Sequence, residues 1–350
     1  MSKIYQMVFD DLKAKIQSSE YKNGDKLPSE NMLMDVYGVS RQTIRQALGM
    51  LEKEGVLEKS QGKGSFVRKK AARVPTKRIA VITLDIGLSV FPPVLKEVEE
   101  VMFSHGYATM LFSTQSSVLR ERRILQQLVE NPVDGIIMYA TMAIFGCENL
   151  DLFRVLMDMG TKFVFMDTKY ADPELSEIPC VSMEDRQGAY EVTSRILRDS
   201  PASLCCFTTY ASPHIVERTI GIRRALLDQG FRFDENDFIS VFSAERLDEG
   251  TVGKLCQINT YEVVICTSGV FAIPVIQALN RNGTGNVKKI VVFDGLALPP
   301  FEGATIWILR HADQEMGRIC AQKLLNLIVG KPEASCRRPW RYREEGKKPK

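Results

Sequence analysis

Two arginines, Arg41 and Arg45, lie one helical turn apart in a segment that opens with Ser40, a residue type that commonly caps helices. Ile44 and Leu48 recur in the same segment at helical spacing, so one face of the helix is expected to be buried while the arginines share another. Positive charge near a helix N-terminus opposes the helix dipole, and this pattern therefore favours an anionic partner. DNA phosphates and guanine edges fit, because a recognition helix enters the major groove with its N-terminal residues first.

The segments around these arginines predict a winged helix-turn-helix. A first helix is expected over residues 4–18, with an inward apolar stripe of Ile4, Met7, Val8, Leu12 and Ile16. A second is expected from a cap at Ser29 to Tyr37, and its inward residues would be Met32, Leu33 and Val36. Gly38 permits a tight turn into the third helix. Two short strands around the glycine-rich segment 61–64 would then form a hairpin whose backbone can approach a phosphate or the minor groove closely.

The order of these motifs resembles the DNA-binding domain of the GntR family of bacterial regulators. The resemblance is carried by Lys26-Leu27-Pro28-Ser29-Glu30, Gly38-Val39-Ser40-Arg41-x-Thr43-Ile44-Arg45-x-Ala47-Leu48, Leu51-Glu52-x-Glu54-Gly55 and Gly62-Lys63-Gly64-Ser65-Phe66-Val67. It implies that Arg41 and Arg45 read the major groove and that Gly62 and Lys63 place the wing in the minor groove. The DNA-contacting residues that it implies are Ser29, Glu30, Ser40, Arg41, Gln42, Thr43, Arg45, Gly62 and Lys63.

One position departs from the family pattern. Many members have arginine after the glutamate of the second helix, whereas this chain has Asn31, so a phosphate contact is not carried over there. A basic helix face can also be merely solvated, but the cap, the turn glycine and the wing occur together here and favour DNA binding.

The charge distribution supports two regions with different partners. Residues 1–78 carry a net charge of +7, residues 79–335 carry −9 and the last fifteen carry +5, although the whole chain is only at +3. A basic front suits a polyanion, and the acidic middle argues against the whole chain lying on nucleic acid. The eight cysteines form no C-x-x-C pair and no run of about eighteen apolar residues occurs, so we expect reduced thiols, a cytoplasmic protein and no membrane span.

At 350 residues the chain predicts more than one domain. We expect a winged helix over 1–70, a basic linker over 71–78, a larger domain over 79–343 and a basic tail over 344–350. From residue 79, continuous apolar strands alternate with amphipathic helices, which predicts an α/β architecture with two parallel sheets in tandem. Expected helices include residues 190–198, 216–229 and 247–258, and a final edge strand is expected around residues 337–343.

Polar and aromatic residues stand where the predicted strands end. In open parallel sheets, ligands bind beyond the carboxyl ends of the strands. Those ends carry Asp85, Tyr139, Asp167, Thr208, Ser268 and Asp294. Carboxylates can accept hydrogen bonds from hydroxyls and a ring can stack on an apolar sugar face, so the pattern favours a polyhydroxylated ligand.

From residue 77 to about residue 343 the chain resembles the effector domain of the LacI/GalR family, which is related to periplasmic sugar-binding proteins. The carrying segments are residues 89–99, 133–137, 164–167, 185–189, 218–226, 291–294 and 315–325. The resemblance implies that Phe91 stacks on a ligand, that Asp167 binds hydroxyls from the first lobe, and that Arg218 with Asp294 does so from the second. The further ligand residues that it suggests are Tyr139, Asp185, Phe242, Ser268 and His311.

Some of these residues have alternative roles. Asp85 and Asp185 could equally cap the following helices, and Ser268-Gly269 stands where the family usually has Asn-Asp, which leaves the identity of the ligand open. We expect a homodimeric repressor that leaves a palindromic operator when a monosaccharide binds, a free pentose or deoxyhexose rather than a sugar phosphate. A pyridoxal-phosphate enzyme with a regulatory head is the alternative, but no site for that cofactor, no metal spacing and no catalytic motif is recognisable.

Overall fold

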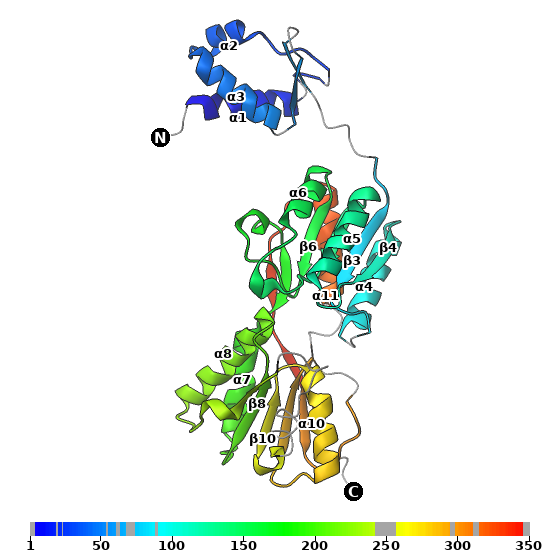
Figure 1. Ribbon diagram of the computed structural model, residues 1–350, viewed down its shortest axis with the longest axis vertical. Coiled ribbons are helices and arrows are strands. Elements are labelled where there is room, and N and C mark those ends of the chain that lie inside the picture. The colour runs from blue at the N-terminus through cyan, green and yellow to red at the C-terminus, as the bar shows by residue number, and fades with distance from the viewer. Residues whose placement is uncertain are drawn as a thin grey trace. The chain divides into compact units, whose positions relative to one another are not determined.

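The computed structural model describes residues 4–18, 20–22, 24–53, 55–60, 64–67, 74–87, 90–241, 257–294, 298–310 and 315–345. The chain divides into two compact units, Met1–Pro75 and Thr76–Lys350, which are drawn in Figure 1 and are described separately. Among the described residues, no helix has the length and apolar character needed to cross a membrane.

The first unit packs three helices against a two-stranded hairpin. Its elements are α1 (Ile4–Gln17), α2 (Glu30–Tyr37), α3 (Arg41–Lys53), β1 (Leu57–Ser60) and β2 (Gly64–Val67). The strands are antiparallel, with Leu57 opposite Val67 and Ser60 opposite Gly64. The core is formed mainly by Val8, Leu12, Leu27, Leu33, Ile44, Ala47, Leu51, Leu57 and Val67. The three helices and the hairpin therefore match the predicted winged helix-turn-helix.

Local chemistry fixes the two helix boundaries that matter most. The Ser29 hydroxyl accepts a hydrogen bond from the amide of Met32 at 3.3 Å, as an N-cap does. Gly38 has a left-handed φ of 62° and donates its amide to the carbonyl of Met34, which ends α2. Because only two residues follow before α3 starts at Arg41, the two helices form the predicted helix-turn-helix.

The apolar stripes of α1 and α2 are narrower than the sequence suggests. Ile4 and Met7 are 63% and 53% exposed, and Met32 and Val36 are 58% and 69% exposed, so their predicted inward orientation is wrong. A domain of three short helices has one small core, and it accommodates only the central line of each stripe. The outer apolar residues remain on the surface, as is common in soluble proteins.

The first lobe of the second unit is built on a parallel sheet with strand order β13-β7-β6-β5-β3-β4. Its strands are β3 (Arg78–Thr83), β4 (Ala108–Ser113), β5 (Gly135–Met138), β6 (Lys162–Met166), β7 (Cys180–Met183) and β13 (Cys336–Arg338). One face packs against α4 (Phe91–Ser104) and α11 (Met316–Ile328), and the other against α5 (Val118–Glu130) and α6 (Leu150–Asp158).

The second lobe repeats this plan with strand order β14-β12-β11-β10-β8-β9, in which β14 alone is antiparallel. Its strands are β8 (Leu204–Thr208), β9 (Phe238–Ser240), β10 (Val263–Cys266), β11 (Lys289–Phe293), β12 (Thr305–Arg310) and β14 (Arg341–Glu345). One face packs mainly against α10 (Gly269–Asn282), and the other against α7 (Asp185–Leu197) and α8 (Pro213–Asp228). The two predicted parallel sheets are thus present. The single edge strand expected around residues 337–343 is instead two strands, β13 at the edge of the first sheet and β14 at the edge of the second, because the chain crosses between the lobes at residues 339–340.

Two helices start earlier than their apolar pattern indicates. The structure begins α7 at Asp185 rather than residue 190, and α8 at Pro213 rather than residue 216. The added residues, 185–189 and 213–215, include Gly188, Pro213 and His214, and they lack the apolar repeat on which the prediction depended. The predicted helix over 247–258 falls mostly in 242–256, outside the described residues; residues 258–260 form a single 3-10 turn.

Helices α7 and α8 approach closely at one glycine. A Cβ atom on Gly221 would lie 2.2 Å from the carbonyl oxygen of Arg186 and 3.0 Å from the Cβ of Ala189. Backbone cannot yield as a flexible side chain can, so this contact requires the absence of a side chain.

We therefore expect Gly221→Ala to lower the free energy of unfolding of the second unit by about 1–3 kcal/mol, since overpacking forces the helices apart. Urea denaturation followed by tryptophan fluorescence isolates this unit, because both tryptophans, Trp307 and Trp340, belong to it. Leu227→Ala on the same helix is the control: its side chain is 62% exposed, and the change should stay within about 0.5 kcal/mol. Equal stability of the two variants would contradict the close approach.

Candidate nucleic-acid interface and effector site

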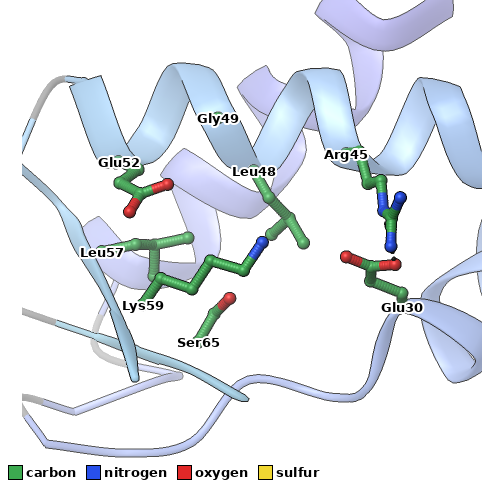
Figure 2. Close-up of a pocket in the computed structure, with 8 residues that line it drawn as sticks. All are labelled: Glu30, Arg45, Leu48, Gly49, Glu52, Leu57, Lys59 and Ser65. Carbon is green, nitrogen blue, oxygen red and sulfur yellow. Dashed lines mark hydrogen bonds and ion pairs between the residues drawn. The ribbon is translucent and has the colours of Figure 1, made fainter. Parts of the chain in front are cut away.

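The two arginines of α3 are each held by a residue in the first turn of α2. Arg45 Nε lies 2.9 Å from Glu30 Oε2, and Arg41 Nη2 lies 2.6 Å from Asn31 Oδ1. Figure 2 shows the first of these pairs, with the Arg45 side chain descending from α3 onto Glu30. Both arginines are exposed, so the pairs hold the guanidinium groups in place without burying them.

The turn before α3 is also ordered by side chains. The Ser40 hydroxyl accepts from the amide of Thr43 at 3.3 Å and lies 2.9 Å from the Thr43 hydroxyl. Ser29 and Ser40 thus both use an oxygen lone pair for capping, which leaves the hydroxyl proton of Ser29 to donate elsewhere. Gln42 is exposed beside them. Of the predicted DNA contacts, Gly62 and Lys63 lie outside the described residues.

A small pocket of about 40 Å³ lies between α3 and the hairpin (Figure 2). Leu48 and Leu57 form its apolar part, and Lys59 extends from β1 toward its centre. This volume would hold only a few water molecules, since one water needs about 10–15 Å³ of such space. The pocket is therefore too small to hold a sugar-sized ligand.

In the second unit, the fully buried Arg218 is the centre of a charged cluster. Its Nε donates to Asp185 Oδ1 at 2.7 Å, and its Nη1 donates to Asp294 Oδ2 at 2.5 Å and to the carbonyl of Thr267 at 2.7 Å. Burial alone would lower the pKa of Arg218, but the carboxylates of Asp294 and Asp185 raise it, so the guanidinium stays charged. Burial also raises the pKa of the Asp185 carboxyl, and Arg218 opposes that effect.

Two aromatic rings enclose the same guanidinium. The Arg218 guanidinium carbon lies 4.8 Å from the ring centre of Trp340 and 5.1 Å from that of Phe293, within cation–π range. Trp340 Nε1 donates to Asp185 Oδ1 at 3.2 Å. Asp185 starts α7 directly after β7, and Trp340 lies between β13 and β14, so both belong to segments that cross from one lobe to the other. The Arg218 cluster therefore links two of the segments that cross between the lobes.

A second polar group joins the two lobes directly. Tyr139 and Asp167 follow β5 and β6 of the first lobe, and Ser212 and His214 begin α8 of the second. The Tyr139 hydroxyl lies 3.3 Å from the Ser212 hydroxyl, and His214 Nδ1 lies 2.8 Å from the Ser212 hydroxyl and 3.6 Å from Asp167 Oδ2. Burial, followed by the Asp167 charge, raises the pKa of Tyr139, so the phenol is neutral and can both donate and accept.

The structure brings together most of the predicted ligand residues. Phe91 begins α4 and meets Tyr139 edge to face at a ring separation of 5.9 Å, and Asp167 lies beside His214 in the same region. Asp167 and Asp294 both have left-handed φ values, 65° and 59°, directly after β6 and β11.

Of two further predicted ligand residues, one has a local role and the other lies at a helix start. Asp85 accepts a hydrogen bond from the amide of Gly87 at 2.8 Å and so stabilises its own turn. Ser268 stands at the N-terminus of α10, next to the Thr267 carbonyl that Arg218 contacts. Phe242 and His311 lie outside the described residues.

Sequence reasoning missed His214, Ser212 and Trp340. The histidine and serine flank Pro213 just after a strand, a position typical of a helix start, and that signal could have placed them beside the strand ends. The sequence places Trp340 only in an edge strand, because the arginines around it give no sign that its ring packs against Arg218. No group of three or more possible metal ligands occurs among the residues with described positions.

The buried cluster yields a stability prediction. Arg218→Met should lower the free energy of unfolding of the second unit by about 3–5 kcal/mol, because it leaves Asp185 and Asp294 without their positive partner. Arg224→Met is the matched control: it removes an exposed pair with Asp228 on the same helix and should change stability by less than about 1 kcal/mol. Urea denaturation measures both, and Arg218→Lys, which keeps the charge, should fall between them. Similar losses in the two methionine variants would show that the cluster contributes little.

Comparison with known proteins follows the same division of the chain. Residues 4–67 match the model of bacterial regulatory proteins of the gntR family, and residues 76–343 match periplasmic binding proteins and the sugar binding domain of the LacI family. The chain is 28% identical over 322 residues to the arabinose metabolism transcriptional repressor of Geobacillus stearothermophilus, covering 89% of this chain and 88% of that protein. It is 30% identical over 337 residues to the repressor of the same name from Halalkalibacterium halodurans, covering 93% and 89%.

Solved structures support the fold of the larger unit. A LacI transcriptional regulator from Alkaliphilus metalliredigens, crystallised with D-xylulofuranose, aligns with a TM-score of 0.63 at 16% identity, over 76% of this chain and 97% of that one. The relatives are transcriptional regulators, which excludes the alternative of a pyridoxal-phosphate enzyme. The chain belongs to the transcriptional regulators that join a GntR-family DNA-binding domain to a sugar-binding effector domain of the LacI family.

Proposed function

We propose that the protein is a homodimeric repressor of carbohydrate-utilisation genes, which leaves a palindromic operator when a neutral monosaccharide binds between the lobes of its second unit. The observation that carries the proposal is the polar group formed by both lobes: Tyr139 and Asp167 from one, Ser212 and His214 from the other. A ligand that inserts among these side chains must exchange contacts with both lobes at once. It therefore biases the angle between them, which is what an effector has to do.

The charges around this site favour an uncharged effector. Among the described residues, Asp167, Asp185 and Asp294 supply three carboxylates, whereas Arg218 supplies one guanidinium that two of them already contact. A phosphate or carboxylate would meet net negative charge, but hydroxyl groups can donate to carboxylates. Phe91 and Tyr139 supply rings for an apolar sugar face.

The comparisons are consistent with a pentose. The relatives named above are arabinose metabolism repressors, and the Alkaliphilus regulator holds D-xylulofuranose. We therefore favour a free pentose over a deoxyhexose or a sugar phosphate as the effector of this chain.

On the DNA side, α3 would enter the major groove. Arg41, Gln42, Thr43 and Arg45 would face base edges and phosphates, while Ser29, Glu30 and Ser40 orient this surface and the wing residues Gly62 and Lys63 reach the minor groove. One winged helix makes few phosphate contacts, and related dimers place one DNA-binding domain on each half of a palindromic site. Two copies of the chain therefore suit the task better than one.

The dimer would form through the first lobe of the second unit. Strand β4 ends the sheet order of that lobe, and Figure 1 shows it at the outer edge beside α4 and α5. Large apolar side chains are exposed on these three consecutive elements: Phe103 at 75%, Leu111 at 47% and Leu119 at 72%. Exposed apolar residues along an edge strand are a typical basis for association.

Dimerisation gives a direct test. Leu111→Glu should shift the protein from dimer to monomer in sedimentation velocity runs at micromolar concentration, because it buries a charge in the interface. Leu227→Glu, at an exposed apolar site on α8 of the second lobe, should leave the dimer intact. A wild-type chain that sediments as a monomer would contradict the dimer, and loss of the dimer in Leu227→Glu instead would move the interface to the other lobe.

The function is tested by selecting duplexes from a randomised pool with the full-length protein and then titrating sugars against the enriched duplex. We expect an inverted repeat, and its release by a free pentose but not by pentose phosphates. A coupling of about 1–3 kcal/mol would weaken operator binding 5- to 150-fold.

One pair of variants separates the sugar site from the DNA site. Asp167→Asn should weaken the sugar response about 10- to 100-fold, because a charged acceptor contributes about 1.5–3 kcal/mol, while operator affinity without sugar stays unchanged. Glu177→Gln, an exposed change in the same lobe, should respond like wild type. Release by sugar phosphates alone would overturn the effector class, and enrichment of no inverted repeat would overturn the operator proposal.

A further inference from the structure

The contact between Asn31 and Arg41 links two helices at the front of the DNA-binding unit. Asn31 lies in the first turn of α2 and Arg41 is the first residue of α3, and their atoms Oδ1 and Nη2 are 2.6 Å apart. The sequence offered no role for Asn31, because it replaces an arginine of the family pattern. Its neighbour Glu30 holds Arg45 in a parallel way, at 2.9 Å.

The chemistry of the two groups fixes the orientation of the amide. A guanidinium group has only donors, so Asn31 can contact Arg41 only through its carbonyl oxygen. The amide NH₂ of Asn31 is therefore directed away from the guanidinium. The contact uses one of the five N–H bonds of Arg41, and four remain, which is more than the two that a guanine edge requires.

The partner of Arg41 is neutral, whereas the partner of Arg45 is charged, and this changes how strongly each arginine is attracted to DNA. Glu30 places a negative charge against Arg45 and offsets part of its attraction to DNA, whereas Asn31 orients Arg41 and leaves its full positive charge. An arginine side chain carries about 2 kcal/mol of rotamer entropy, which an exposed side chain loses when it docks. An arginine that is already held in one orientation loses less rotamer entropy when it binds DNA, and its guanidinium N–H groups point in a defined direction.

We propose that Asn31 is a positioning residue that sets the base preference of Arg41. It acts through the guanidinium and not as a phosphate contact of its own. This inference depends on the proposed docking of α3 in the major groove, and it adds a determinant of base preference on α2 beside Glu30.

The experiment compares full-length wild type with Asn31→Leu, which has similar size but no hydrogen-bonding group. Each protein is used to enrich duplexes from a randomised pool. Its binding is then measured by fluorescence anisotropy on the wild-type consensus duplex, on duplexes with single base-pair changes, and on a scrambled duplex, at several salt concentrations. Thermal melting confirms that each variant is folded.

We expect Asn31→Leu to lose about tenfold in discrimination at one G·C pair in each half-site, with unchanged affinity for the scrambled duplex and an unchanged salt dependence. Asn31→Asp keeps the acceptor, so it should retain the base preference while binding both duplexes more weakly because of its charge. Met32→Ala, at the next residue and 58% exposed, is the control and should match wild type.

The possible failures are distinguishable. An Asn31→Leu protein with the wild-type consensus and the wild-type discrimination overturns the role of Asn31 while leaving the proposed function intact. A uniform loss of affinity with a smaller salt slope also overturns it, since that result identifies Asn31 as a phosphate contact. A wild-type protein that enriches no sequence overturns the proposed function and this inference together.

Discussion

The second unit depends on one buried positive charge. An isolated guanidinium in the interior would be strongly unfavourable, so Arg218 requires Asp185, Asp294 and the Thr267 carbonyl around it. These partners come from a crossing segment and from the ends of two strands, and satisfying Arg218 therefore fixes the geometry where the lobes meet. Trp340 closes the arrangement from another crossing segment. The pairing that makes burial tolerable is the same pairing that places carboxylates at the proposed ligand site.

Charge is managed differently in the two units. In the second unit, opposite charges are buried and meet at short range, where water cannot screen them. In the first, Arg41 and Arg45 stay exposed and are held by single contacts with Asn31 and Glu30, so they can exchange those partners for DNA. Weak, exposed pairing suits a surface that must bind and release, whereas strong, buried pairing suits a fixed junction between two lobes.

The sequence predicted the elements whose signals are local. The cap at Ser29, the left-handed Gly38 and the continuous apolar strands act over a few residues, and the helix-turn-helix and both sheets followed from them. The misses depend on packing between distant segments. Whether Met32 or Val36 is buried depends on how much core a small domain has, and the contact of Trp340 with Asp185 joins residues 155 positions apart. His214 has no periodic signature, and although its place at a helix start is visible in the sequence, its pairing with Asp167 depends on how the two lobes pack.

The two lobes have matching strand orders, which bears on how the chain evolved. In each sheet the third strand of the order, β6 in one lobe and β11 in the other, is followed by an aspartate in the left-handed conformation, which few non-glycine residues adopt. Asp167 and Asp294 are thus equivalent under the internal pseudo-symmetry, although one now lies beside a histidine and the other binds an arginine. A half-molecule duplicated in tandem would produce this correspondence. Later divergence of the partners would let two copies of one ancestral carboxylate approach a single asymmetric sugar from opposite sides.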